Sequence, residues 1–284
     1  MAFRLGVLTD EISEDLEEAI TIAKAWGLDE IELHNVWGKN VCDLSDAELS
    51  RAIRIVRKSG LPVTCIDSLT LRCDLDDDEA YSRHIAHLCR SIQIAPLFGA
   101  RIVRLFSFWK LNHKDELTWE RIWEKLELPI RIAEREGITL GFENVSSGNI
   151  GTSAELERLF TEFPSPALRL IWDPANAAAA GDPRPAVEGY ERLKEHIVHV
   201  HVKDVAFVNG QREWQPIGKG IVDYPPMFAA MLRDGYDGVV ALETHWRPAQ
   251  RKRSGRLRGV PPGAPAGDRC SRTAPSSLLS GDRA

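Results

Sequence analysis

Histidine and lysine recur at every second position in the segment His196-Ile-Val-His-Val-His-Val-Lys-Asp204. Because side chains alternate between the two faces of a β-strand, this spacing places His199, His201 and Lys203 on one face and three valines on the other. A surface strand usually carries Thr, Lys and Glu on its polar face, so two successive imidazoles favour a polar cavity. Imidazoles there can bind a metal or exchange protons. Histidines that only form hydrogen bonds within a half-buried strand are the competing interpretation.

Short aliphatic and β-branched segments alternate along the chain with longer segments of helical periodicity. The predicted strands are residues 3–9, 30–34, 62–67, 101–106, 138–143, 168–173, 197–202 and 238–243. The helices between them lie near residues 13–27, 45–59, 77–98, 115–136, 185–195 and 225–233, and a further short helix starts at residues 152–155. Ser13 is the expected cap of the first helix, and Ser45 with Glu48 forms a capping box for the second.

Strict alternation of this kind predicts a parallel sheet, and eight strands in about 250 residues match a (β/α)8 TIM barrel. A doubly wound open sheet is the alternative, but no GxGxxG follows the first strand. The pattern stops after His245-Trp246, one helix short, so the eighth helix is expected to be incomplete or atypical.

Charge divides the chain into two parts. Residues 249–284 carry a net charge of +6 and are rich in Arg, Gly and Pro, which leaves −12 on residues 1–248. We expect a barrel domain at 1–248 and a disordered basic tail at 249–284. A basic arm that binds anionic surfaces, or an ending created by a shifted reading frame, are the alternatives for the tail. An acidic body repels phosphate backbones, so nucleic acid is not the expected partner.

The remaining composition favours a cytoplasmic protein. Five cysteines without CxxC spacing indicate reduced thiols rather than disulfides or a zinc knot. The N-terminal segment resembles a strand rather than a signal peptide, and no apolar run is long enough to cross a membrane. A homo-oligomer is compatible with the sequence, which does not define its size.

Four predicted strands end in a residue that can bind a metal. By strand parity, Glu143, Asp173, His201 and Glu243 point into the barrel and meet at its carboxyl end, where the active sites of such barrels lie. Three carboxylates and one imidazole form an oxygen-rich set that suits Mn²⁺, Mg²⁺ or Co²⁺ and can hold Zn²⁺. Each acid taken alone could instead cap a helix or pair with an arginine. The four together predict one divalent metal ion.

Five motifs in order resemble the sugar phosphate isomerase/epimerase family of the xylose isomerase-like TIM barrel superfamily. The resemblance covers about residues 3–246, and its motifs are Gly-Phe-Glu-Asn at 141–144, Trp-Asp-Pro-Ala-Asn at 172–176, His-Val-His-Val-Lys-Asp at 199–204, Pro-Ile-Gly-Lys-Gly at 216–220 and Leu-Glu-Thr-His at 242–245. It implies the same four metal ligands. It also implies that Glu143 and Glu243 form the acid/base pair on opposite faces of the substrate.

The resemblance therefore implies an isomerase or epimerase of a sugar, sugar phosphate or keto-polyol. Removal of a proton next to a carbonyl gives an enediolate, which a metal stabilises. Other polar residues at the mouth are expected to contact the small carbohydrate substrate: Asn176, Lys203, His34, Glu32, Arg104 and Asp67. For Glu32, His34 and Asp67, hydrogen bonding inside the barrel is an equal alternative. Trp37, Phe108 and Trp109 could wall the site or pack their own loops.

Three other interpretations compete with this prediction: a dehydratase, an inactive barrel and a nuclease. A metal-dependent dehydratase of a keto-polyol or dehydroshikimate-like acid begins with the same proton abstraction. An inactive barrel would bind no ion. An apurinic endonuclease-like nuclease needs further histidines, but Asn176 stands where many superfamily members carry the histidine of Asp-x-x-His. The loop Gly218-Lys219-Gly220 could bind a phosphate or be an ordinary turn.

Overall fold

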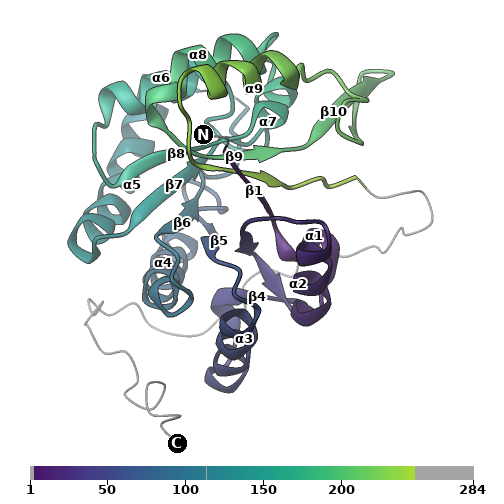
Figure 1. The fold of residues 1–284 in the computed structure, drawn as a ribbon. Coiled ribbons are helices and arrows are strands. Elements are labelled where there is room, and N and C mark those ends of the chain that lie inside the picture. The colour runs from purple at the N-terminus through teal and green to yellow at the C-terminus, as the bar shows by residue number, and fades with distance from the viewer. Residues whose placement is uncertain (1–2, 113, 247–284) are drawn as a thin grey trace, which may run out of the picture.

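The computed structural model describes residues 3–112 and 114–246. Its eight parallel strands lie in the order β1-β12-β9-β8-β7-β6-β5-β2, and a bridge between Leu8 and Glu32 joins the two end strands (Figure 1). The strands of this nearly closed barrel are β1 Arg4–Val7, β2 Ile31–Leu33, β5 Val63–Thr70, β6 Ile102–Leu105, β7 Thr139–Glu143, β8 Leu168–Trp172, β9 Ile197–Val202 and β12 Val239–Leu242. The predicted (β/α)8 barrel is confirmed.

Helices alternate with these strands and surround the barrel (Figure 1). They are α1 Thr9–Ile12, α2 Leu16–Ala25, α3 Asp46–Ser59, α4 Asp78–Phe98, α5 Glu116–Glu136, α6 Ser153–Glu162, α7 Pro174–Ala180, α8 Tyr190–Leu193 and α9 Tyr224–Arg233. Two short antiparallel hairpins were not predicted: β3 Asn35–Val36 with β4 Lys39–Asn40, and β10 Asp204–Val208 with β11 Gln211–Gln215.

The capping box of α3 is confirmed, whereas the predicted cap of the first long helix is wrong. Ser45 accepts a hydrogen bond from Glu48 N, and the Glu48 side chain accepts one from Ser45 N. At α2, however, Asp15 accepts the hydrogen bond from Glu18 N, while Ser13 Oγ donates to the Glu18 carboxylate over 2.6 Å. A carboxylate at the cap also complements the positive end of the helix.

The segment predicted as one helix at 185–195 is irregular. It contains a π-helical turn at Pro185–Gly189, the short α8, and a 3₁₀ turn at Lys194–His196. Gly189 lies so close to the fully buried Trp172 that a Cβ atom would come within 2.7 Å of the indole. The backbone therefore passes directly over the outward face of β8.

The core lies between the strands and the surrounding helices, and the barrel interior is polar toward its carboxyl end. Leu140, Phe142 and Trp172 are fully buried on the outward faces of β7 and β8, as predicted from strand parity. Asp67 and His201 are fully buried as well, although both are ionisable. Such groups are seldom buried unless they are paired.

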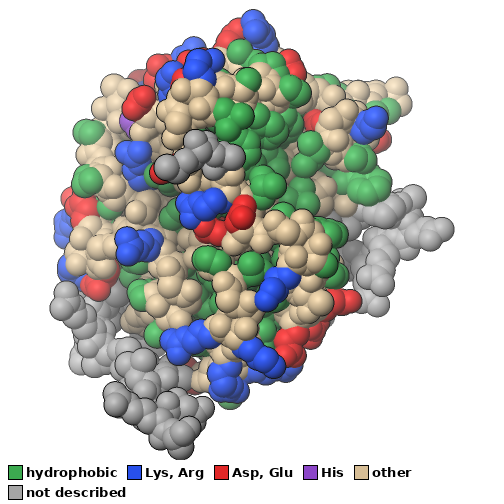
Figure 2. Space-filling model, in the orientation of Figure 1, with side chains coloured by type: hydrophobic (Ala, Val, Ile, Leu, Met, Phe, Trp, Pro, Cys, Tyr) green, Lys and Arg blue, Asp and Glu red, His purple; other side chains and the backbone are tan. Residues whose placement is uncertain are grey.

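The predicted tail at 249–284 and the eighth helix lie outside the described residues. Within the described part of the chain, the helices are all too short or too polar to cross a membrane. On the face seen in Figure 2, acidic and basic side chains are interspersed with hydrophobic ones.

Candidate active site

Four side chains that sequence analysis selected as metal ligands meet at the carboxyl end of the barrel. Glu143 ends β7, Asp173 follows β8, His201 lies on β9, and Glu243 follows β12. All four are buried, and one possible ligand atom from each lies within 4.8 Å of the other three. The strand register explains this, because Ala241 pairs with His201 and places Glu243 just beyond it.

Two cations lie among these carboxylates. Lys203 Nζ is 2.7 Å from Asp173 Oδ2 and 2.5 Å from Glu243 Oε2. Arg104 Nη1 is 2.9 Å from Glu143 Oε2 and 3.3 Å from Glu243 Oε1. The same guanidinium approaches Asp67 through Nε, at 3.4 Å. One guanidinium therefore bridges the two glutamates, and buried carboxylates of like charge are held together by positive neighbours.

The pKa values of the four side chains differ accordingly. Burial alone would raise the pKa of Glu143 and Glu243, but nearby cations more than offset it, so both pKa values lie below the ordinary one. These cations include Arg104 and His201 at Glu143, and Lys203 and His245 at Glu243. Burial dominates at Asp173, whose pKa is raised despite Lys203. Burial lowers the pKa of His201, but surrounding carboxylates raise it well above the ordinary value.

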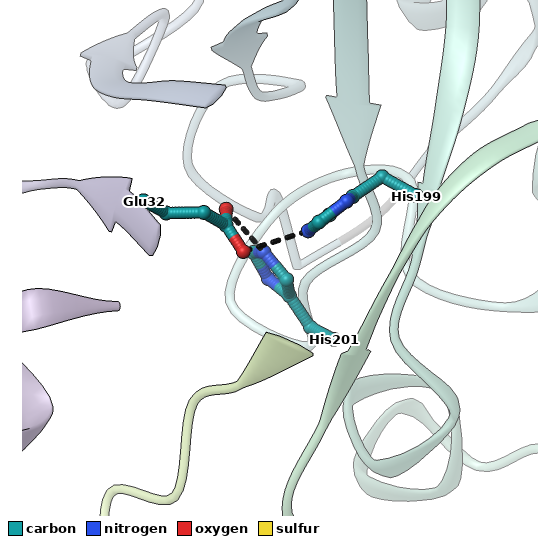
Figure 3. Close-up of side chains that lie close together, drawn as sticks. All are labelled: Glu32, His199 and His201. Carbon is teal, nitrogen blue, oxygen red and sulfur yellow. Dashed lines mark hydrogen bonds and ion pairs between the residues drawn. The ribbon is translucent and has the colours of Figure 1, made fainter. Parts of the chain in front are cut away.

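Glu32 joins the two histidines of β9 from the opposite side of the barrel. Its carboxylate lies 2.7 Å from His199 Nε2 and 3.2 Å from His201 Nε2, and all three side chains are fully buried (Figure 3). Because Nε2 of His201 faces Glu32, Nδ1 faces Glu143 at 3.4 Å and Glu243 at 3.5 Å. A histidine that binds a metal commonly has its second nitrogen held by a carboxylate in this way.

The donor set fits a single divalent cation. Three carboxylates and one imidazole nitrogen converge closely enough for one ion, and Nδ1 of His201 has no hydrogen-bond partner among the described residues. Oxygen ligands with one nitrogen suit Mg²⁺ and Mn²⁺ and are compatible with Zn²⁺. The role of these residues as ligands stays a prediction.

Asn144 and Asn176 position the acidic residues. Asn144 Oδ1 accepts a hydrogen bond from Asp173 N, and its Nδ2 donates to Asp173 O, both at 2.9 Å. Asp173 in turn caps α7 by accepting a hydrogen bond from Asn176 N at 2.8 Å. Asn176 Nδ2 lies 3.2 Å from Glu143 Oε1 and donates to it. The Asp-Pro-Ala-Asn motif is therefore a helix start whose fourth residue reaches back to Glu143.

Two of the four predicted ligands, Glu143 and Glu243, line a cavity of about 360 Å³. Six of the predicted catalytic and substrate-binding residues line it: Glu143, Glu243, Asn176, Lys203, His34 and Arg104. The other predicted substrate contacts, Glu32 and Asp67, are fully buried and are not among its lining residues in the described chain. Glu32 pairs with the histidines, and Asp67 lies against Arg104.

Residues that were not predicted form the walls. Trp214 and Arg212 come from the β10–β11 hairpin, Asp10 comes from α1, and Arg72 and Phe106 follow β5 and β6. In the described chain, Trp37, Phe108 and Trp109 are not among the residues that line this cavity, and Trp37 and Phe108 pack in the hydrophobic core. The signal for the hairpin was Asn209-Gly210, a turn pair whose residues both have positive φ, 52° and 76°.

The Gly218-Lys219-Gly220 loop is held by the chain itself. The Asp204 carboxylate accepts hydrogen bonds from Gly218 N and Gly220 N, each at 2.9 Å, and also from Val205 N and Val222 N. A Cβ at position 220 would lie 2.1 Å from Asp204 Oδ1. The backbone amides that could bind a phosphate there already hold a carboxylate, so this loop is a structural turn.

Comparisons with known proteins agree with the fold and the motifs. An inosose dehydratase of Lacticaseibacillus casei is 25% identical over an alignment of 153 residues, and the match covers 49% of this chain and 51% of that protein. The chain thus spans about half the length of the first curated relatives it matches. L-ribulose-5-phosphate 3-epimerase UlaE of Salmonella paratyphi C (strain RKS4594) is 26% identical over an alignment of 242 residues, and the match covers 80% of this chain and 81% of that protein.

A solved structure and a family model extend the comparison. A xylose isomerase-like TIM barrel protein from Mycobacterium smegmatis, solved in complex with magnesium, superposes with a TM-score of 0.68 at 19% identity and covers 86% of this chain and 91% of that one. This likeness concerns the fold. Residues 20–265 match the family model described as Xylose isomerase-like TIM barrel. The chain belongs to the Xylose isomerase-like TIM barrel family, as its motifs indicated.

Proposed function

We propose that this protein is a divalent-metal-dependent isomerase or epimerase of a sugar, sugar phosphate or keto-polyol. The observation that carries the proposal is the position of Glu143 and Glu243, which belong to the cluster of four predicted ligands and also line the cavity. Two carboxylates at one cavity can remove a proton beside a carbonyl and return one. The L-ribulose-5-phosphate epimerase among the relatives supports this reaction class.

Glu143, Asp173, His201 and Glu243 would hold the metal ion. Bound there, a divalent cation stabilises the negative charge that develops on a carbonyl oxygen when the neighbouring proton leaves. Mn²⁺, Mg²⁺ and Co²⁺ suit the donor set, and Zn²⁺ is also compatible with it.

Both glutamates are carboxylates in the metal-free protein, the form that can accept a proton. Their lowered pKa values keep both ionised at neutral pH, and Arg104 Nη1 contacts both carboxylates and so fixes their separation. One glutamate removes the proton on one face of the substrate. The other glutamate takes up a proton from solvent and delivers it to the opposite face of the same carbon, which inverts that carbon. In an isomerase, the proton that the first glutamate removed is delivered instead to the neighbouring carbon, whose hydroxyl proton passes to the former carbonyl oxygen, so the carbonyl changes position.

Deuterium exchange tests this proposal. The Mn²⁺-loaded protein is incubated in D₂O with candidate ketoses, and deuterium incorporation next to the carbonyl is followed by NMR. Glu143→Gln and Glu243→Gln should each lower the exchange rate by about 10²- to 10⁴-fold. Glu30→Gln is the matched control, because Glu30 is a buried carboxylate that pairs with Arg4 and Thr64 and does not line the cavity.

Two results would reject the proposal. The first is wild-type exchange that persists after complete removal of metal by chelator. The second is a rate in either glutamine variant that equals the rate of Glu30→Gln.

A dehydratase is the second candidate, and the position of Lys203 favours it. Its ammonium group lines the cavity within 2.7 Å of both Asp173 and Glu243, where it could give a proton to a departing hydroxide. The inosose dehydratases among the relatives support this candidate. A dehydratase would give a product lighter than the keto-polyol substrate by the mass of one water molecule, which mass spectrometry detects. An isomerase would give a product of the same mass as its substrate.

A further inference from the structure

Arg72 is a cation at the cavity without an acidic partner. It follows β5, and its guanidinium lies against two aromatic rings, 5.0 Å from the centroid of Phe106 and 4.9 Å from that of Trp109. No carboxylate among residues 3–112 and 114–246 pairs with it, and its buried Nε has no hydrogen-bond partner there. A partly buried guanidinium held between rings retains its charge and its donors for a ligand.

Most of the other charged groups of the cavity are already paired. Arg104 and Lys203 contact the carboxylates of the predicted metal cluster, Asp10 accepts hydrogen bonds from His34 and Asn35, and Glu11 pairs with His245. Arg212 on β11 resembles Arg72, since its hydrogen bond goes to the neutral Ser146 Oγ and its guanidinium lies over Trp214. The cavity wall therefore presents two cations without acidic partners, and a divalent ion in the cluster would add further positive charge.

The backbone around Arg72 is strained and firmly held. Leu71, which is fully buried, has a φ of 65°, a left-handed conformation that is unfavourable for a residue other than glycine. Leu71 O accepts a hydrogen bond from Phe108 N, and Cys73 O accepts one from Trp109 N, both at 2.9 Å. These bonds fix Arg72 between the loops that follow β5 and β6.

Arg72 also lies at a useful distance from the predicted catalytic groups. The guanidinium carbons of Arg72 and Arg104 are each 5.0 Å from the Phe106 ring centroid, so they are separated by no more than twice that distance. Arg104 contacts both catalytic glutamates directly. A substrate whose ketone lies at Glu143 and Glu243 could extend past Phe106 and place its far end at Arg72.

We infer that Arg72, assisted by Arg212, binds an anionic group at the end of the substrate remote from the ketone. The inference rests on the proposed function for the location of the ketone. The ligand is a phosphate ester or a carboxylate, since both can accept two parallel hydrogen bonds from a guanidinium. The substrate is therefore an acidic derivative, either a ketose phosphate or a keto acid, rather than a neutral sugar.

Equilibrium binding of matched ligand pairs tests this inference. The probes are D-ribulose 5-phosphate with D-ribulose, and 3-dehydroshikimate with its methyl ester, titrated calorimetrically into the Mn²⁺-loaded protein. The wild type should bind the anionic member of one pair about 10- to 100-fold more tightly, as expected for a charge-assisted hydrogen bond. The pair that shows the preference identifies phosphate or carboxylate as the recognised group.

Three variants separate recognition from packing. Arg72→Met keeps the apolar stem and should reduce the preference to less than threefold while the affinity for the neutral member stays unchanged. Arg72→Lys should retain part of the preference. Arg51→Met is the control, because Arg51 also stacks on an aromatic ring, 4.4 Å from the Trp37 centroid, but does not line the cavity.

The inference is overturned if the wild type discriminates within neither pair, or if Arg72→Met weakens both members equally. Persistence of the full preference in Arg72→Met would also overturn it. These results are independent of turnover. A preserved anion preference without deuterium exchange would reject the proposed function alone, and exchange without any preference would reject only this inference.

Discussion

Replacement of Glu32 by Gln should weaken binding of a divalent ion although Glu32 is not among the predicted ligands. Burial alone would raise the pKa of Glu32, but the charges of His199 and His201 more than offset it and hold that pKa below its usual range. The Glu32 carboxylate therefore faces His201 Nε2 as an anion, which orients Nδ1 toward Glu143 and Glu243. Loss of an outer carboxylate of this kind typically lowers metal affinity 10- to 100-fold, or about 1.4–2.7 kcal/mol.

The assay is competition between the protein and a chelating dye for Mn²⁺ or Zn²⁺. Glu30→Gln serves as the matched control, since Glu30 is a buried, ion-paired carboxylate only two residues away that contacts no predicted ligand in the described chain. Thermal unfolding in chelator verifies that both variants fold. An affinity of Glu32→Gln within twofold of Glu30→Gln would show that Glu32 does not position His201.

Two further predictions concern stability. Lys203→Met leaves Asp173 and Glu243 without their shared ammonium, so in chelator it should destabilise the protein by about 3–5 kcal/mol. Mn²⁺ should restore much of this loss in thermal unfolding experiments, and a melting temperature in chelator equal to that of the wild type would contradict the pairing. Burial lowers the pKa of His84 from 6.5 to about 4, so the unfolded chain binds more protons between these values. The contribution of neutral His84 to the free energy of unfolding is complete above pH 6.5, and about 2–3 kcal/mol of it is lost as the pH falls toward 4. In urea unfolding experiments across this pH range, His84→Gln should therefore lose less stability than the wild type. An equal pH dependence in the two proteins would contradict this prediction.

The barrel could be predicted because its strands and helices carry strong local patterns. The barrel strands are short runs rich in aliphatic and β-branched residues, and the capping box at Ser45 and Glu48 marks a helix start. The elements that were missed are short. The segment Thr9–Ile12 offers a single helical turn, and the irregular stretch after Pro185 depends on contact with Trp172, which no local pattern records.

Strand parity was sufficient to bring the four predicted ligands together. Strand parity predicts which face of its strand each residue occupies and how near the carboxyl end it lies. Because the strands are parallel and in register, residues at the same level on neighbouring strands lie close together. Parity could not show that Glu32 reaches across the barrel to β9, because that contact links residues 167 positions apart. Nor could it identify Arg72, whose role depends on a positive φ at Leu71 and on two rings from another loop.

The Asp204 carboxylate accepts four backbone amide hydrogen bonds and so fixes the base of the β10–β11 hairpin. Asp204 begins β10 and holds the loop that follows β11, so the hairpin is closed at its base by the chain alone. The hairpin residues that line the cavity, Arg212 and Trp214, lie beyond that closure, whereas the predicted ligands lie on the barrel strands or directly after them. Trp214 contacts Lys203 and His245, but substitutions nearer the turn of the hairpin should leave the two predicted catalytic glutamates in place. In related barrels, such a hairpin would be free to diverge toward new substrates while the reaction itself is conserved.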